Sequence, residues 1–283
     1  SRLQPYLWSS LEARAMSGRE KRLMPTATSL QPIKPLSLRE RQPATLHAVE
    51  LAPGVHIIGG KSGGRVRAFL IEHGGELTLI DTLYETDGRS VLAEIRRLGR
   101  SPADLKRIAL THAHRSHLGG LAVLKRESGA SVLSHEWEAD IIAGERKAQP
   151  VTILPRLPLR AWFPFQVGLA LGRGKHPPCP VDEPLGEGDE LAGLQVLHVP
   201  GHTPGHLAFW APEHRLLLTG DAIATWPRFE AGWPAFNLNP EQQRASIRRM
   251  AALEPMAVAV GHGDPIQQGA AAYLARHTTL PGS

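Results

Sequence analysis

Three histidines lie within six residues, at positions 112, 114 and 117 of the segment HAHRSH. Imidazole nitrogens are common ligands of zinc and of other transition metals. In an extended segment, residues two apart point the same way, so His112 and His114 can face one ion while His117 turns toward a neighbouring point. A polar turn that happens to be rich in histidine is the alternative, but three buried imidazoles without partners would be costly. The spacing therefore predicts a metal site.

Further candidate ligands follow, each placed after a short apolar segment. His202 lies in PGHTPGH, Asp221 in GD and His262 in GHG. The preceding segments 194–199, 215–219 and 256–260 are typical of buried strands, as is 105–110 before the first histidine. Strands are also predicted at 55–58, 66–71, 77–80, 131–133 and 206–210. Helices are predicted at 88–98, 118–127, 240–253 and 269–276 from apolar residues at helical spacing.

The order of these motifs resembles the metallo-β-lactamase-fold hydrolase superfamily over residues 46–275. The resemblance implies an α/β fold, the αβ/βα four-layer sandwich of two β-sheets flanked by helices. It also implies that His112, His114 and His202 hold one metal. A second metal would be held by His117 and His262, with Asp221 bridging both ions.

Two further residues are expected to support the ligands. Asp81 ends the predicted strand 77–80, and the resemblance implies that it accepts a ring N–H from a ligand histidine. A simple turn-starting aspartate is the alternative. His206 follows His202 by four residues and is interpreted as a supporting or structural residue.

One position departs from the family pattern. The first motif is usually H-x-H-x-D-H, and Ser116 stands where the aspartate is expected. A neutral hydroxyl is a far weaker ligand than a carboxylate, so the second site is expected to be weakened. We expect two zinc ions, with iron or manganese and a mononuclear site as alternatives. Ser116 or Asp221 would then orient the attacking water.

The chain divides into a basic, proline-containing N-terminal arm at 1–45 and one hydrolase domain at 46–283. The arm carries eight Lys or Arg and three Asp or Glu, whereas the rest carries 24 of each. The arm is expected to be extended, and its apolar residues could join two chains as a homodimer. A solvated leader is the alternative.

An inserted segment at about 150–183 is rich in proline and aromatic residues and is expected to form a lid or a cleft wall. Together with aromatic residues after Asp221, it predicts a hydrophobic substrate pocket. Ordinary core packing is the alternative for each residue. The expected pocket residues are Trp162, Phe163, Phe165, Trp226, Phe229, Trp233 and Phe236.

Composition excludes several classes. The single cysteine, Cys179, allows no intrachain disulfide, no apolar run is as long as a membrane span, and no signal peptide core is visible. We therefore expect a cytoplasmic enzyme with a small-molecule substrate, no nucleic acid partner and no membrane partner.

The predicted reaction is attack of a metal-activated hydroxide on a small, fairly hydrophobic ester or lactone. β-Lactam, phosphoester and thioester hydrolysis are alternatives. A weakly active or mononuclear metal-binding member, including an iron-dependent oxygenase, is a further one.

Overall fold

The computed structural model describes residues 49–60, 62–148, 158–171, 174–230 and 232–278. The N-terminal arm and the homodimer contact predicted for it lie outside these residues, as do parts of the predicted lid segment.

Seven strands form the first sheet. They lie in chain order: β1 (Val49–Ala52), β2 (Val55–Gly59), β3 (Arg67–His73), β4 (Glu76–Ile80), β5 (Leu105–Ala109), β6 (Ser131–Ser134) and β7 (Glu183–Pro184). The pairs from β1 to β4 are antiparallel, and the pairs from β4 to β7 are parallel. The parallel half carries the first histidine motif at the end of β5.

Five strands form the second sheet, in the order β12 (Ala257–Ala259), β11 (Leu216–Leu218), β10 (Leu207–Ala211), β9 (Leu194–His198) and β8 (Glu190–Leu191). β11 and β12 are parallel, whereas β10 is antiparallel to both of its neighbours. β9, β11 and β12 therefore point the same way, and their carboxyl ends meet at one edge.

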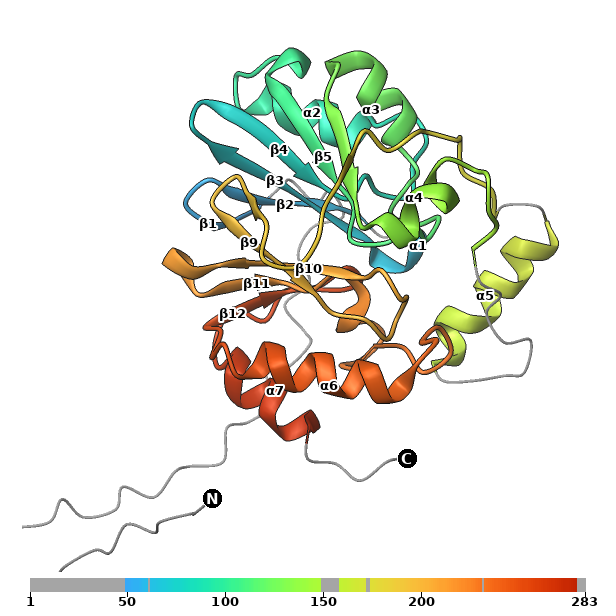
Figure 1. Cartoon of the computed structure of the whole chain (residues 1–283), viewed down its shortest axis with the longest axis vertical. Helices are drawn as coiled ribbons and strands as arrows, with labels where there is room; N and C mark the ends of the chain where they lie inside the picture. The colour runs from blue at the N-terminus through green and yellow to red at the C-terminus, as the bar shows by residue number, and fades with distance from the viewer. Residues whose placement is uncertain (1–48, 61, 149–157, 172–173, 231, 279–283) are drawn as a thin grey trace, which may run out of the picture. The chain divides into compact units, whose positions relative to one another are not determined.

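Helices cover the outer faces of both sheets (Figure 1). α2 (Arg89–Arg97), α3 (Leu121–Ser128) and α4 (Glu136–Ile142) cover the first sheet, and α6 (Pro240–Ala251) and α7 (Ala270–Thr278) cover the second. A third apolar cluster, which includes Phe69 and Phe209, fills the space between the sheets. The predicted αβ/βα four-layer sandwich is confirmed.

Local sequence explains the boundaries of these elements. Val91 and Ile95 lie one turn apart on the buried face of α2. α6 begins after Asn239, whose side chain accepts two backbone N–H groups, and Pro240 occupies the first helical position. Most expected elements are found within a few residues of the predicted limits.

Some elements were not predicted. α5 (Leu159–Ala170) forms inside the segment that was expected to be a lid or a cleft wall, and Pro164 lies within it. β1 forms at the half-exposed edge of the first sheet. Short turns make up α1 (Ser62–Arg65), η1 (Pro102–Asp104), η2 (Pro212–His214) and η3 (Gly220–Ala222). Among the residues that the structure describes, no helix has the length and apolar character needed to cross a membrane.

Replacing Phe209 by alanine tests the layer between the sheets. The ring is fully buried, so its loss should lower the free energy of unfolding by about 3–5 kcal/mol, measured by denaturant unfolding. Met256→Ala is the control, because Met256 is largely exposed and should change this energy by less than about 0.5 kcal/mol. An equal loss in both variants would contradict the proposed core.

Candidate metal centre

The carboxyl ends of strands from both sheets converge on one site. The histidine motif follows β5, and Asp81 follows the parallel neighbour β4. His202, Asp221 and His262 follow β9, β11 and β12. The sheets are joined at this edge, because the Leu207 N–H donates to the Thr111 carbonyl at 2.9 Å.

Four of the expected ligands form a first donor group. The ligand atoms of His112, His114, His202 and Asp221 all lie within 4.8 Å of one another. His202 Nε2 is 3.0 Å from His114 Nδ1 and 3.6 Å from Asp221 Oδ2. His112 Nε2 is 3.8 Å from the same Asp221 oxygen. The three rings thus surround one point.

A second donor group shares Asp221 with the first. It consists of His117, Asp221 and His262, which are all buried. His117 Nε2 is 3.3 Å from Asp221 Oδ1, and His262 Nε2 is 3.3 Å from Asp221 Oδ2. The carboxylate of Asp221 therefore lies between two clusters of imidazoles.

These distances fit metal ions. Two nitrogen ligands of a tetrahedral zinc, each about 2.0–2.1 Å from the ion, lie roughly 3.3 Å apart. His112 Nε2, His117 Nε2 and Asp221 Oδ1 are buried and make no hydrogen bond. Buried polar atoms are normally satisfied, so three such atoms in the two groups that share Asp221 fit bound cations. The six residues predicted as ligands are brought together.

Fixed acceptors orient the second donor group. His117 Nδ1 is 2.8 Å from Asp81 Oδ2, and His262 Nδ1 is 2.9 Å from the Gly64 carbonyl. Both partners accept hydrogen bonds, so each ring donates from Nδ1 and turns Nε2 toward Asp221. Gly64 has a positive φ, and a Cβ there would lie 3.3 Å from His262 Nδ1. This close approach favours glycine.

The first group is oriented in the same way. Thr111 Oγ1 donates to Asp81 Oδ2 at 2.8 Å and therefore accepts from His112 Nδ1 at 2.9 Å. His202 Nδ1 lies 3.1 Å from the side-chain oxygen of Asn237. Thr111 and Asn237 were not predicted, because neither lies in a motif that signals this role.

Glu138 in α4 links the two loops that carry the first donor group. It accepts the Ala113 N–H at 3.0 Å, the Thr203 hydroxyl at 2.5 Å and the Gly205 N–H at 3.1 Å. Ala113 lies between two ligand histidines, and Thr203 follows His202. Burial raises the pKa of Glu138, although these hydrogen bonds oppose that effect. No sequence motif predicts this role for Glu138.

Two other predicted residues lie beside the ligands. His206 accepts the backbone N–H of Asp221 at 3.1 Å through Nε2, so it holds the loop that carries the shared carboxylate. Ser116 is half-buried in the turn that runs from His114 to His117, where the His117 N–H donates to the His114 carbonyl. It offers no carboxylate to the second donor group.

The two groups differ in their protonation. Burial lowers the pKa of His112 and His114 well below the usual range, and burial also lowers the pKa of His202. Burial acts the same way on His117, but the carboxylates of Asp81 and Asp221 outweigh it and raise its pKa to about 10. The first group therefore presents neutral imidazoles, whereas an ion at the second group must displace a proton.

An aromatic wall extends from the second group. The Trp233 ring lies 4.5 Å from the His262 ring and 5.3 Å from Phe236, which contacts Phe165 of α5 at 5.0 Å. Trp162 and Trp226 pack against the same cluster. Five of the seven predicted pocket residues thus form one apolar surface beside the site.

The other two predicted pocket residues are corrections. Phe163 is 63% exposed and lies on the outer face of α5. Phe229 packs at 4.5 Å against Tyr273 of α7 and belongs to the cluster beneath the second sheet. Phe163 is at the surface and Phe229 is in a core cluster. The sequence pattern alone did not distinguish either position from a pocket.

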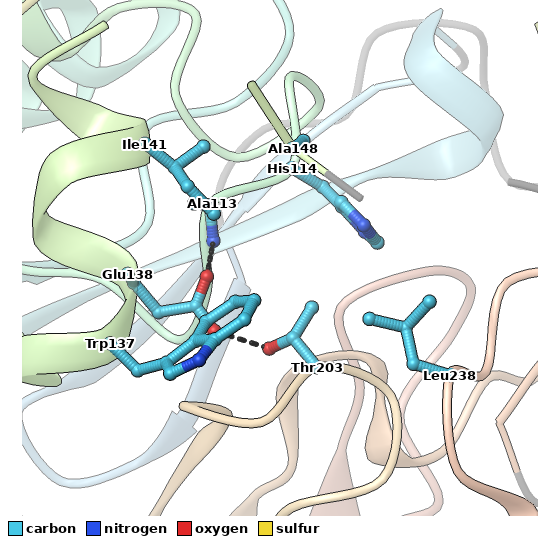
Figure 2. A pocket seen from close by; sticks show the side chains of 8 residues that line it. All are labelled: Ala113, His114, Trp137, Glu138, Ile141, Ala148, Thr203 and Leu238. Atoms are coloured by element: carbon cyan, nitrogen blue, oxygen red, sulfur yellow. Dashed lines mark hydrogen bonds between the residues drawn. The ribbon is translucent and has the colours of Figure 1, made fainter. Parts of the chain in front are cut away.

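A small cavity of about 10 Å³ lies beside His114, with room for about one water molecule. Figure 2 shows Glu138 between Ala113 and Thr203 at its base. Apolar side chains complete the lining, including Trp137, Ile141 and Leu238. The first donor group therefore has a mostly apolar neighbouring space on the α4 side.

Comparison with known proteins agrees with this site. Residues 62–262 match the metallo-β-lactamase superfamily, so the chain belongs to that superfamily and is a metal-dependent hydrolase. The "Probable metallo-hydrolase YflN" of Bacillus subtilis is 27% identical, over 77% of this chain and 86% of that protein.

A hydroxyacylglutathione hydrolase of Pseudomonas aeruginosa is 34% identical, over 53% of this chain and 43% of the relative. The solved structure of TTHA1623 in a di-iron-bound form is 28% identical, with a TM-score of 0.53 over 78% of this chain and 94% of that one.

Glu138→Gln should weaken metal binding at the first group. Glutamine keeps the shape but replaces one acceptor oxygen with an NH₂ group, so one of the three bonds that align the loops is lost. We expect zinc affinity to fall about 10–100-fold in competition with a chromophoric chelator. Glu136→Gln is the matched control, because Glu136 is an exposed carboxylate in the same helix. Equal affinities in the two variants would contradict this role.

Zinc affinity at the second group should rise with pH. His117 is protonated below a pKa of about 10, so the ion competes with this proton throughout pH 6–9. The association constant should increase by up to about tenfold per pH unit, measured by chelator competition. Asp81→Asn removes one of the charges that hold the proton and should flatten the slope. A wild-type affinity that does not change with pH would contradict the assignment.

Proposed function

We propose that the protein hydrolyses small, fairly hydrophobic esters or lactones with two zinc ions, the second held more weakly. The observation that supports this most directly is the pair of donor groups that share Asp221. Zinc held by imidazole and carboxylate donors supplies a hydroxide at neutral pH by lowering the pKa of bound water.

The side chains hold and orient the reacting centre. His112, His114 and His202 would hold the first ion, and His117 and His262 would hold the second. Asp221 belongs to both donor groups and would contribute to both sites. Asp81 fixes the ring of His117, so His117 Nε2 stays directed toward the second site although residue 116 is a serine and not an aspartate. No side-chain nucleophile is required.

The aromatic wall supports a hydrophobic substrate. Trp233 is buried beside His262, Phe236 is buried against Trp233, and Trp226 also contacts Trp233. Such a surface favours an acyl or alkyl chain through burial of apolar area. It also keeps water away from the reacting bond, which strengthens the charge interactions there.

Thioester hydrolysis is the second candidate. It is favoured by the relatives named hydroxyacylglutathione hydrolase, although this chain covers less than half of the P. aeruginosa protein. The chemistry of attack is the same for a thioester, so only the leaving group and its binding site differ. Iron is the alternative metal, because the similar protein TTHA1623 was solved in a di-iron-bound form.

Ser116→Asp should raise the occupancy of the second site. The new carboxylate adds an anionic donor to a group that has only Asp221 and two imidazoles. Elemental analysis at one limited zinc supply should show about one ion per wild-type chain and about two in the variant. His262→Ala in the same background should return the value to about one. Values near one in all three proteins would contradict a second site.

A chain-length series tests the substrate class. Transition-state binding should improve by about 0.8 kcal/mol for each added methylene until the apolar surface is filled, measured as kcat/KM for esters and lactones. Trp233→Ala should flatten this series, while Met256→Ala, at an exposed position, should leave it unchanged. A matched thioester panel separates the second candidate. A flat wild-type series would contradict a hydrophobic pocket.

A further inference from the structure

α5 carries apolar residues on two faces. Its inner face packs Ala161, Trp162 and Phe165 against the aromatic cluster beside the metal centre. Its outer face shows Leu159 (51% exposed), Phe163 (63%) and Val167 (43%), and Leu171 (62%) follows the end of the helix. These four make up more than half of the large exposed apolar side chains in the described part of the chain.

The exposed residues form one stripe. They are spaced four apart, so each lies about 40° around the helix from the one before. The centre of this stripe lies about 180° from the buried face formed by Ala161, Trp162 and Phe165. α5 also stands apart from the helix layers that cover the two sheets (Figure 1). No described helix or strand covers the stripe.

The sequence segment that contains the stripe carries charges of one sign. Between Glu145 and Asp182 the sequence contains six Lys or Arg and no Asp or Glu. Of these basic residues, Arg160 lies on α5 and Lys175 lies just beyond it, and both are exposed. An exposed apolar stripe flanked by cations is typical of helices that lie at the surface of anionic membranes.

We propose that the outer face of α5 docks on an anionic lipid bilayer, with Leu159, Phe163, Val167 and Leu171 entering the boundary between headgroups and acyl chains. A second copy of this chain would also cover the stripe, but it would bring two basic α5 segments together. Anionic headgroups instead neutralise these charges, so the lipid surface is the better partner. Docking of this kind needs no membrane-spanning run, whose absence was the basis for expecting no membrane partner.

Docking would place the bilayer beside the metal centre. The inner face of the same helix continues through Phe236 and Trp233 to His262. An amphipathic ester or lactone in the bilayer would then meet an apolar surface that leads toward the metal ligands. This extension to the substrate rests on the proposed function, whereas docking itself does not.

The test is co-sedimentation of the full-length protein with vesicles of phosphatidylcholine, with and without about one third phosphatidylglycerol. We expect binding to the anionic vesicles that weakens in high salt. L159S/F163S/V167S should reduce it by at least about tenfold, because the apolar stripe is lost. R160E/K175E should reduce binding to anionic vesicles by a similar factor. Met256→Ser, at an exposed apolar position outside α5, is the control and should bind like the wild type.

All variants retain the basic N-terminal arm. A difference in vesicle binding between a variant and the wild type therefore reports on α5 and not on the arm. Circular dichroism and melting temperature verify that each variant is folded. Undiminished vesicle binding by the folded triple variant, or no wild-type binding to either vesicle, would overturn the proposal. So would a wild-type dimer in light scattering that L159S/F163S/V167S converts to monomers. None of these outcomes depends on catalytic activity, so ester and lactone hydrolysis is tested separately.

Discussion

The burial of one carboxylate governs this structure. Asp221 lies among imidazoles that come from both sheets, and one of its oxygens has no hydrogen-bond partner. A carboxylate removed from water must be balanced by positive charge, which here comes from metal ions or from protonated histidine. Because His112 follows β5 and Asp221 follows β11, that balance also holds the two sheets together at one edge. Packing of the two sheets and assembly of the site therefore depend on each other.

Hydrogen bonds from neighbouring groups set the orientation of the imidazole rings. A histidine that binds a metal ion through one nitrogen usually donates its other ring N–H to a fixed acceptor, which sets the orientation of the ring. Asp81, Thr111 and Asn237 supply such acceptors from three different loops. Glu138 then ties the loop after β5 to the loop after β9. The rings of His117, His202 and His262 are therefore oriented by groups that are distant in sequence.

The difference between the candidate ligands and the groups that orient them explains what the sequence could predict. The six candidate ligands follow short apolar strands at specific spacings, so the motif order was sufficient to predict that they come together. Glu138 and Asn237 belong to no such pattern, because their role arises only when separate loops meet in space. Phe163 was misplaced for a different reason: α5 is apolar on both faces, so periodicity cannot show which side turns inward. Phe229 finds its partner in α7, far along the chain.

The asymmetry of the two donor groups gives a physical role to Ser116. With no ion at the second group, a protonated His117 is paired with both Asp81 and Asp221, so the two buried carboxylates share one cationic partner. A carboxylate at 116 would add a third negative charge, which one imidazolium cannot balance. A serine at 116 would therefore suit a second site that can exchange its ion, whereas an aspartate would suit one that always holds it. The departure from the family pattern is consistent with the rest of the charge arrangement.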